Sequence, residues 1–384
     1  MNTHTNCLPL IETLIGFDTT SAKTNLALIH FIAEYLESSG ASIRLTKNPD
    51  HTKANIFATI GPNDVPGIVL SGHTDVVPAS PADWTSDPFA AQVRDQRIYG
   101  RGTADMKSFI AIALSLAPNF AKANLRQPIH FAFSYDEEVG CLGVRSLIAD
   151  LAFLPVKPAL CLVGEPTEMG VIVGHKGKKS VTCTVHGKEG HSALNHKGVN
   201  AVEIASDIVT KIRSIQKRIR THGPFEDGYD PPYSTLHTGV IHGGTALNII
   251  PKECQFEFEI RNLPSHDPND IMAELRGHAQ DLVPEMLAVD MSTGIMFDER
   301  NTTVGLSVSD ESEPAKLACQ LSGHNHTSKV AFTTEAGLFA AAGIPAVVCG
   351  PGSIDQAHRP DEFITLDQVA KCETFLGDLL RRMT

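Results

Sequence analysis

Short, almost continuously apolar runs alternate along the chain with longer stretches in which apolar residues recur at helical spacing. Helical spacing is seen at 26–39, which ends before Gly40, and at 106–116. The apolar runs predict strands at 54–60, 67–71, 129–134, 159–163 and 346–349. Strands that are apolar on both faces and alternate with helices indicate a sheet buried on both sides. The predicted fold is α/β, with a mixed, mostly parallel sheet sandwiched by helices.

The middle of the chain follows a different pattern. Six segments there alternate between strand-like and helix-like periodicity: 179–186, 201–219, 234–241, 253–260, about 268–282, and 287–292. The fifth is a helix that should start at Pro268, behind Asp267. The order βαββαβ is that of a ferredoxin-like unit. We therefore predict an inserted α+β domain at 178–292, and a second domain built from 1–177 and 293–384.

Composition and charge narrow the class of protein. The 384 residues are 42% hydrophobic and 20% charged, as in an ordinary globular enzyme, and the net charge of -12 disfavours nucleic acid as a partner. No apolar stretch has the length of a membrane helix, and the N-terminal MNTHTNCLPL lacks the pattern of a secretory signal. Eight scattered cysteines without a CxxC pair suit reduced thiols. We expect a cytoplasmic protein with no membrane partner.

Histidines and carboxylates recur where predicted strands end or helices begin. The carboxyl ends of parallel strands meet at one edge of an α/β sheet, where ligands bind, so residues distant in sequence can converge there. One such residue carries little weight, because polar residues are ordinary turn formers. Five places rich in His and carboxylate make a candidate site: His73 with Asp75, Asp105, Glu137 with Glu138, Glu165, and His358.

The chemistry of this set points to metal. Imidazole and carboxylate ligands without thiolate suit Zn²⁺, Co²⁺ or Mn²⁺. A pair of ions needs a bridging carboxylate and terminal ligands for each ion, and one bridge, two His and two Glu would suffice. Asp75 is spaced to accept a hydrogen bond from the His73 ring, or alternatively to cap a turn. Of Glu137 and Glu138, one could bind metal while the other acts as a base; alternatively, both could belong to a solvated acidic turn.

Five motifs, GHTDVVP, GRGTADMKS, DEEVGCLG, VGEPT and AHRPDE, occur in the order found in the zinc deacylase and exopeptidase family. That family includes acetylornithine deacetylases, succinyl-diaminopimelate desuccinylases, aminoacylases and glutamate carboxypeptidases. The resemblance covers nearly the whole chain. It implies that 178–292 is a lid and dimerisation domain and that 1–177 and 293–384 form the catalytic two-metal domain. It implies two zinc ions, replaceable by Co²⁺ or Mn²⁺. The implied ligands are His73 and Glu165 for one ion, Glu138 and His358 for the other, and Asp105 as the bridge.

The resemblance also implies how the reaction runs. Glu137 resembles the general base, which would take a proton from a water activated by the zinc ions and return it to the leaving amine. Asp75 resembles the residue that orients His73. In KEGHSA, His191 is similar to the lid histidine, implied to stabilise the oxyanion in its own or a partner's active site. A solvent-exposed turn histidine is the alternative. A homodimer through the lid domain is implied by the family.

Substrate contacts follow from the same resemblance. Asn248, in GGTALN, is similar to a lid residue that contacts substrate, and Arg261 to the arginine that binds the substrate carboxylate. A two-pronged guanidinium–carboxylate contact is a chemical reason for that arginine. The backbone at Gly352, in GPGS, would be a second carboxylate contact.

The C-terminal string TTEAGLFAAAGIPAVVCGPGSIDQAHRPDEF is most similar to the acetylornithine deacetylase branch. Glu335 in it would suit a cationic side chain such as that of ornithine, or would be a helix-start carboxylate. The resemblance thus implies hydrolysis of N2-acetyl-L-ornithine to L-ornithine and acetate, a step of arginine biosynthesis. Desuccinylase, aminoacylase and dipeptidase activities, and a catalytically inactive binding protein of the same fold, are the alternatives.

Overall fold

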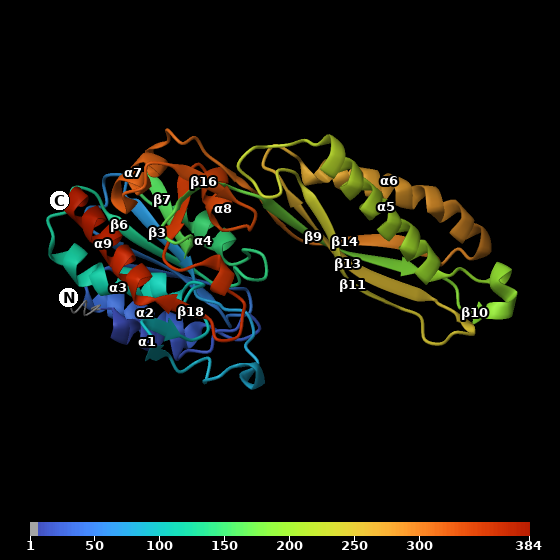
Figure 1. The fold of residues 1–384 in the computed structure, drawn as a ribbon, viewed down its shortest axis with the longest axis horizontal. Coiled ribbons are helices and arrows are strands. Elements are labelled where there is room, and N and C mark those ends of the chain that lie inside the picture. Colours follow the sequence, from blue (N-terminus) through green and yellow to red (C-terminus); the bar gives the residue numbers. More distant parts are fainter. Residues whose placement is uncertain (1–6) are drawn as a thin grey trace. The chain divides into compact units, whose positions relative to one another are not determined.

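The chain is divided into two compact units in a computed structural model that describes residues 7–384 (Figure 1). Residues up to 174, 306–329 and 334–384 make the first unit, and residues 175–305 with 330–333 make the inserted unit. The first six residues, part of the N-terminal segment considered above, lie outside the described residues.

A nine-stranded sheet forms the centre of the first unit, in the order β1-β2-β6-β3-β7-β17-β8-β15, with β16 paired to β8. Its central strands β6, β3, β7 and β17 run parallel, whereas β1, β2 and β8 pair antiparallel with their neighbours. The predicted mixed, mostly parallel α/β sheet is therefore confirmed. The strands are β1 Ser42–Lys47, β2 Ala54–Ile60, β3 Ile68–His73, β6 Ile129–Ser134, β7 Leu160–Pro166, β8 Val171–His175, β15 Leu306–Ser307, β16 Thr327–Val330 and β17 Ala346–Gly350.

Helices cover both faces of this sheet. The helices are α1 Leu8–Ile15, α2 Leu26–Ser38, α3 Lys107–Lys122, α4 Val144–Leu151, α7 Glu313–Ser322, α8 Ala336–Ala341 and α9 Leu366–Met383. Buried residues of α1, α2, α3, α7 and α9 form one continuous core with alternate strand residues such as Ile68 and Leu70. Val69 points to the opposite face, because neighbouring strand residues alternate sides. There α4 packs on β2 and β6, and α8 packs on β7 and β17.

A small three-stranded sheet in the first unit, order β18-β5-β4, joins two segments far apart in sequence. Phe363 pairs with Tyr99 and Thr365 with Arg97, so the segment after His358 lies beside the segment that leads to Asp105. The strands are β4 Gln92–Arg94, β5 Arg97–Tyr99 and β18 Phe363–Thr365.

The inserted unit has a four-stranded antiparallel sheet in the order β11-β13-β9-β14, with two long helices (Figure 1). The sequence order βαββαβ with this strand order is ferredoxin-like, as predicted. A short pair of strands, β10 and β12, lies beyond one end of the sheet. The elements are β9 Gly177–His186, β10 Gly190–His191, α5 Ala201–His222, β11 Thr235–Gly243, β12 Ile249–Ile250, β13 Glu253–Asn262, α6 Pro268–Val289 and β14 Gly294–Thr303.

One predicted element of this unit was wrong. The helix α6 starts at Pro268 as expected, with the Asp267 side chain accepting from the N–H of Asn269, but it continues past Pro284 to Val289. The predicted strand at 287–292 is therefore absent, and the strand is β14, at 294–303. Burial of Met286 against the core favours continuing the helix despite the proline. Because β14 belongs to the inserted unit, residues 293–305 lie with that unit.

Within residues 7–384, no helix is both long enough and apolar enough to cross a membrane.

Candidate metal and catalytic site

The predicted ligands of the first unit come from different elements that end at one edge of its sheet. His73 is the last residue of β3, Glu165 lies near the end of β7, and Glu137 and Glu138 follow β6. These three strands are parallel neighbours, so their carboxyl ends lie together. Asp105 precedes α3, in the loop that follows β5. Backbone topology therefore brings side chains that are distant in sequence to one edge.

Asp105 stands between the two histidines. Its Oδ1 lies 2.8 Å from His73 Nε2 and its Oδ2 lies 3.4 Å from His358 Nε2. Glu165 Oε1 is 3.8 Å from His73 Nε2, and Glu138 Oε2 is 3.0 Å from His358 Nε2. Each histidine is thus accompanied by its own glutamate, and one aspartate faces both. This pairing is the arrangement that a bridged pair of cations requires.

Among residues 7–384, two groups of three or more His, Cys, Asp or Glu side chains have ligand atoms that all lie within 4.8 Å of one another. One consists of His73, Glu137 and Glu165, and the other of His73, Asp105 and Glu138. Proximity thus places Glu137 among the potential ligands as well as in reach of the reaction. Glu137 is therefore close enough to the predicted ligands to act either as a base or as a ligand.

The electrostatics of the cluster fit bound cations. Burial raises the pKa of Glu137, His73 opposes the shift and the charges of Glu138 and Glu335 add to it, and together these effects bring the pKa to about 8. Burial likewise raises the pKa of Glu165, and the Asp105 charge adds to the effect. Carboxylates crowded in a buried site repel one another, and a divalent cation relieves that repulsion. Together with a donor set of imidazole nitrogens and carboxylate oxygens, this excess of negative charge fits a two-metal centre.

The nearby carboxylates also raise the pKa of both histidines. Hydrogen bonds with Asp105 and Glu138 raise the pKa of His358 to about 10. Burial opposes the charge on His73, but Glu165 and Asp105 raise its pKa well above the usual value. Both imidazoles therefore face carboxylates strong enough to hold a positive charge there. A metal ion at each position would take over that role.

Asp75 contacts His73 and also has a second task. The Nδ1–H of His73 donates to the backbone oxygen of Asp75 at 2.9 Å, and the Asp75 carboxylate lies 3.5 Å from the same nitrogen. The carboxylate also accepts from Ser21 Oγ at 2.7 Å and from the backbone N–H groups of Glu137 and Glu138 at 3.0 and 3.2 Å. Asp75 therefore faces the His73 ring with its main chain and its carboxylate, and the carboxylate also holds the loop that carries both glutamates.

Cys141 contacts the predicted base and was not anticipated from the sequence. Its thiol, 2% exposed, donates to Glu137 Oε1 at 3.2 Å. Burial and the Glu137 charge raise the pKa of Cys141 well above its usual value, so the thiol keeps its proton. The spacing of four residues within DEEVGC was the available signal. The contact leaves Glu137 Oε2 for other partners.

Glu335 and Gly352 each form hydrogen bonds with other residues of the protein. Glu335 is 1% exposed, and its two oxygens accept from the hydroxyls of Ser134 and of Ser71, the latter at 3.2 Å. Glu335 is the N-cap residue of α8, so it does lie at a helix start, but its side chain makes no cap hydrogen bond. Burial raises its pKa to about 7. The N–H of Gly352, expected to meet a carboxylate, donates to Gln368 Oε1 at 3.2 Å.

The predicted substrate contacts of the inserted unit lie at opposite ends of its sheet. His191 and Asn248 are neighbours, since His191 pairs with Ile249 in the short β10–β12 ladder. Arg261 stands eight residues along β13 from Glu253, the residue at the His191 end. At the rise of a strand this is about 27 Å. The guanidinium of Arg261 donates to Glu259 at 3.1 Å and to Thr333 at 3.3 Å.

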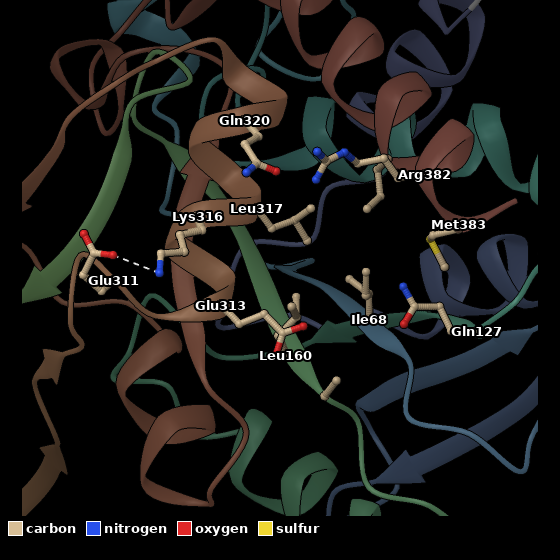
Figure 2. Close-up of a pocket in the computed structure, with 12 residues that line it drawn as sticks. Ile68, Gln127, Leu160, Glu311, Glu313, Lys316, Leu317, Gln320, Arg382 and Met383 are labelled. Carbon is tan, nitrogen blue, oxygen red and sulfur yellow. Dashed lines mark ion pairs between the residues drawn. The ribbon is translucent and has the colours of Figure 1, made fainter.

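A cavity of about 440 Å³ opens at the other edge of the first unit's sheet (Figure 2). Ile68 and Leu160, the first residues of β3 and β7, form part of its wall, and an ion pair between Glu311 and Lys316 lies on its rim. None of the candidate ligands lines it. We therefore assign the candidate site to the carboxyl edge of the sheet, where the histidines and carboxylates meet.

Known proteins are similar to this chain over most of its length. A model of peptidase family M20/M25/M40 matches residues 69–382. A protein named acetylornithine deacetylase from Proteus mirabilis (strain HI4320) is 33% identical over 94% of this chain and 92% of its own length. A second protein of that name, from Edwardsiella ictaluri (strain 93-146), is 32% identical over 93% of this chain and 91% of its own length.

Solved structures share the fold. An M20 family metallo-carboxypeptidase from Sulfolobus solfataricus superposes with a TM-score of 0.78 at 19% identity, covering 99% of each chain. At this level of identity the likeness concerns the fold alone. It extends over both units of the chain.

Proposed function

Because the chain belongs to peptidase family M20/M25/M40, we propose that it is an acetylornithine deacetylase, which hydrolyses N2-acetyl-L-ornithine to L-ornithine and acetate. A metal-dependent hydrolase of amide bonds follows from membership of the family. The observation that carries the choice of substrate is the 33% identity to the Proteus mirabilis protein over 94% of the chain. The product ornithine is consistent with a role in arginine biosynthesis.

The side chains of the carboxyl edge would hold two metal ions. His73 and Glu165 would bind one ion, Glu138 and His358 the other, and Asp105 both, as the distances from its two oxygens to the histidines support. Zinc is the proposed metal, with Co²⁺ or Mn²⁺ able to replace it. Bound there, the metals would polarise the amide carbonyl and lower the pKa of a water molecule.

Glu137 would move the proton. Its Oε1 accepts from the Cys141 thiol, which leaves Oε2 to accept a proton from the attacking water. The same carboxyl group would then give that proton to the nitrogen of the departing ornithine. The Asp75 carboxylate supports this role, because it binds the backbone N–H of Glu137 and so fixes the base in place.

We propose that Arg261 binds the substrate carboxylate, that Asn248 contacts the substrate and that His191 stabilises the oxyanion. Arg261 lies about 27 Å along β13 from Glu253, the end of that strand nearest to His191 and Asn248. Acetylornithine is much shorter, so a single chain cannot offer both Arg261 and His191 to one substrate. This separation supports a homodimer in which each copy contributes His191 and Asn248 to the site of the other.

We assign no substrate contact to Glu335, since both of its carboxylate oxygens accept from serines in the interior. Gly352 keeps its proposed contact with the substrate carboxylate only if its N–H exchanges Gln368 for that ligand. All eight cysteines are free, which suits a reducing compartment, and we propose that the enzyme acts in the cytoplasm.

The substrate is tested by a panel of assays on the zinc- or cobalt-loaded enzyme. We expect kcat/KM for N-acetylornithine to exceed the values for N-succinyl-diaminopimelate, N-acetylmethionine and a simple dipeptide at least about tenfold, a difference of about 1.4 kcal/mol in transition-state binding. A preference for any of the other three would refute the assignment. Absence of turnover with all four and of bound metal after zinc addition would instead indicate an inactive binding protein.

A further inference from the structure

Glu362 is a buried carboxylate that serves a single loop. Its side chain is fully buried, and it lies four residues after His358 in the motif AHRPDE. Four hydrogen bonds reach it, all from residues 101–105: Oε2 accepts from Arg101 Nη1 at 2.6 Å and Gly102 N at 3.1 Å, and Oε1 from Ala104 N at 2.8 Å and Asp105 N at 3.1 Å. Both oxygens are thus committed to the loop that presents Asp105.

The main chain around Glu362 is tied to the same region. The backbone oxygen of Glu362 accepts from Gly100 N at 3.0 Å, and Phe363 pairs with Tyr99 in the β18–β5 ladder. On the other side, Asp361 accepts from the backbone and the hydroxyl of Thr85, both at 2.9 Å. The segment that follows His358 is therefore anchored on both sides of Glu362.

His358 depends on this anchoring. Its side chain is 53% exposed, so packing cannot hold the ring in one direction. Its backbone has φ of +62°, a conformation that non-glycine residues adopt only where the surrounding structure requires it. The ring faces Glu138 and Asp105, and its direction is set by the backbone that leads to Glu362. One carboxylate thus links the loop of Asp105 with the segment of His358.

The charge of Glu362 is matched within the protein. Arg101, 3% exposed, forms the ion pair and also lies over the Trp84 ring, 5.1 Å from its centre. A buried carboxylate is tolerated only when it is paired and fully hydrogen-bonded, and here both conditions are met. Replacement by a neutral amide would leave the guanidinium without its partner. It would also set an NH₂ group against backbone N–H donors.

We propose that Glu362 is a positioning residue of the metal centre, which sets the distance and direction between Asp105 and His358 by binding the Asp105 loop from the His358 segment. This inference rests on the metal centre proposed above. Residues that orient metal ligands commonly alter affinity 10–100-fold when they are changed. Binding of the ion held by Asp105, Glu138 and His358 should be weakened most, because Glu362 anchors two of its three ligands, Asp105 and His358.

The test is a titration of the metal-free protein with Co²⁺, in which binding is measured by calorimetry and by visible absorption. For Glu362→Gln we expect one Co²⁺ equivalent to bind about 10–100-fold more weakly than in the wild type, with a changed ligand-field spectrum. The affinity for the other Co²⁺ equivalent should fall by less than about tenfold, because Asp105 is the only ligand of that ion next to Glu362. Glu362→Asp keeps the charge opposite Arg101 and should give an intermediate loss.

Lys179→Met is the matched control. It removes the buried Lys179 ammonium, which donates to Asn269 and pairs with the exposed Glu299 in the inserted unit, so it should lower the melting temperature and leave both cobalt affinities unchanged. Wild-type affinities and spectrum in Glu362→Gln would overturn the inference, whatever its melting temperature. If that variant does not fold, wild-type affinities in Glu362→Asp would do the same. A wild-type protein that takes up no cobalt would instead overturn the proposed metal centre itself.

Discussion

Replacing Glu137 with Gln separates the two roles that proximity allows. Gln has nearly the same shape and can still accept from the Cys141 thiol, so the fold should be retained. It cannot take a proton from water. A positioned general base contributes 10²–10⁴-fold, so we expect kcat to fall by about that factor, or roughly 3–5 kcal/mol of transition-state stabilisation. Because Glu137 is proposed as the base, the variant should still bind two equivalents of zinc or cobalt.

The metal-free variant should also be more stable than the metal-free wild type. Burial, Glu138 and Glu335 raise the pKa of Glu137 from 4.5 to about 8. The folded state then holds its proton above pH 4.5 while the unfolded state loses it, so this group lowers stability progressively as pH rises from 4.5 towards 8. At pH 7 the difference of 2.5 pH units corresponds to about 3 kcal/mol, which partial exposure reduces to roughly 1–3 kcal/mol.

Three measurements examine this prediction together: turnover, metal content, and urea unfolding of the metal-free proteins at pH 5 and pH 8. The stability gain of Glu137→Gln should be small at pH 5 and larger at pH 8. Loss of one metal equivalent would make Glu137 a ligand and refute its role as the base. Near-normal turnover would refute any catalytic role. A metal-free variant less stable than the wild type at pH 8 would contradict the electrostatic reasoning.

Three further predictions follow from other contacts. Cys141→Ala should lower kcat several-fold with little change in KM, and Cys141→Ser should restore it, because the hydroxyl can still donate to Glu137; equal losses would contradict this. Burial lowers the pKa of His130 and of His175 to about 4, so these histidines take up protons at higher pH in the unfolded chain than in the folded protein. The free energy of unfolding, measured with urea, should therefore fall by about 3 kcal/mol per histidine as pH is lowered from 6.5 to 4. Arg261→Met and His191→Ala should each be nearly inactive, yet mixing and refolding them together should recover roughly a quarter of wild-type activity through mixed dimers, and no recovery would count against shared sites.

Local patterns in the sequence were sufficient for the architecture. The strands at 54–60 and 129–134 agree residue for residue with β2 and β6, because a run apolar on both faces reports a strand buried on both faces. The start of α6 at Pro268 followed from its proline and the preceding aspartate. The edge strand β14 escaped prediction, since half of its residues are exposed and its alternation is weak. The candidate ligands were also readable, because most of them lie at or shortly after the end of a strand and Asp105 lies just before a helix.

What each polar side chain touches depended on contacts between segments far apart in the chain. The spacing of His73 and Asp75 suggested a carboxylate contact, but not that the carboxylate also accepts hydrogen bonds from Ser21 and from the loop of Glu137. Glu335 is bound by serines of two strands. Glu362 lay within a recognised motif, yet its four bonds to residues 101–105 exist only once β18 pairs with β5. Periodicity records whether a position is buried, whereas hydrogen-bond partners are chosen by the packing of whole elements, which no local pattern contains.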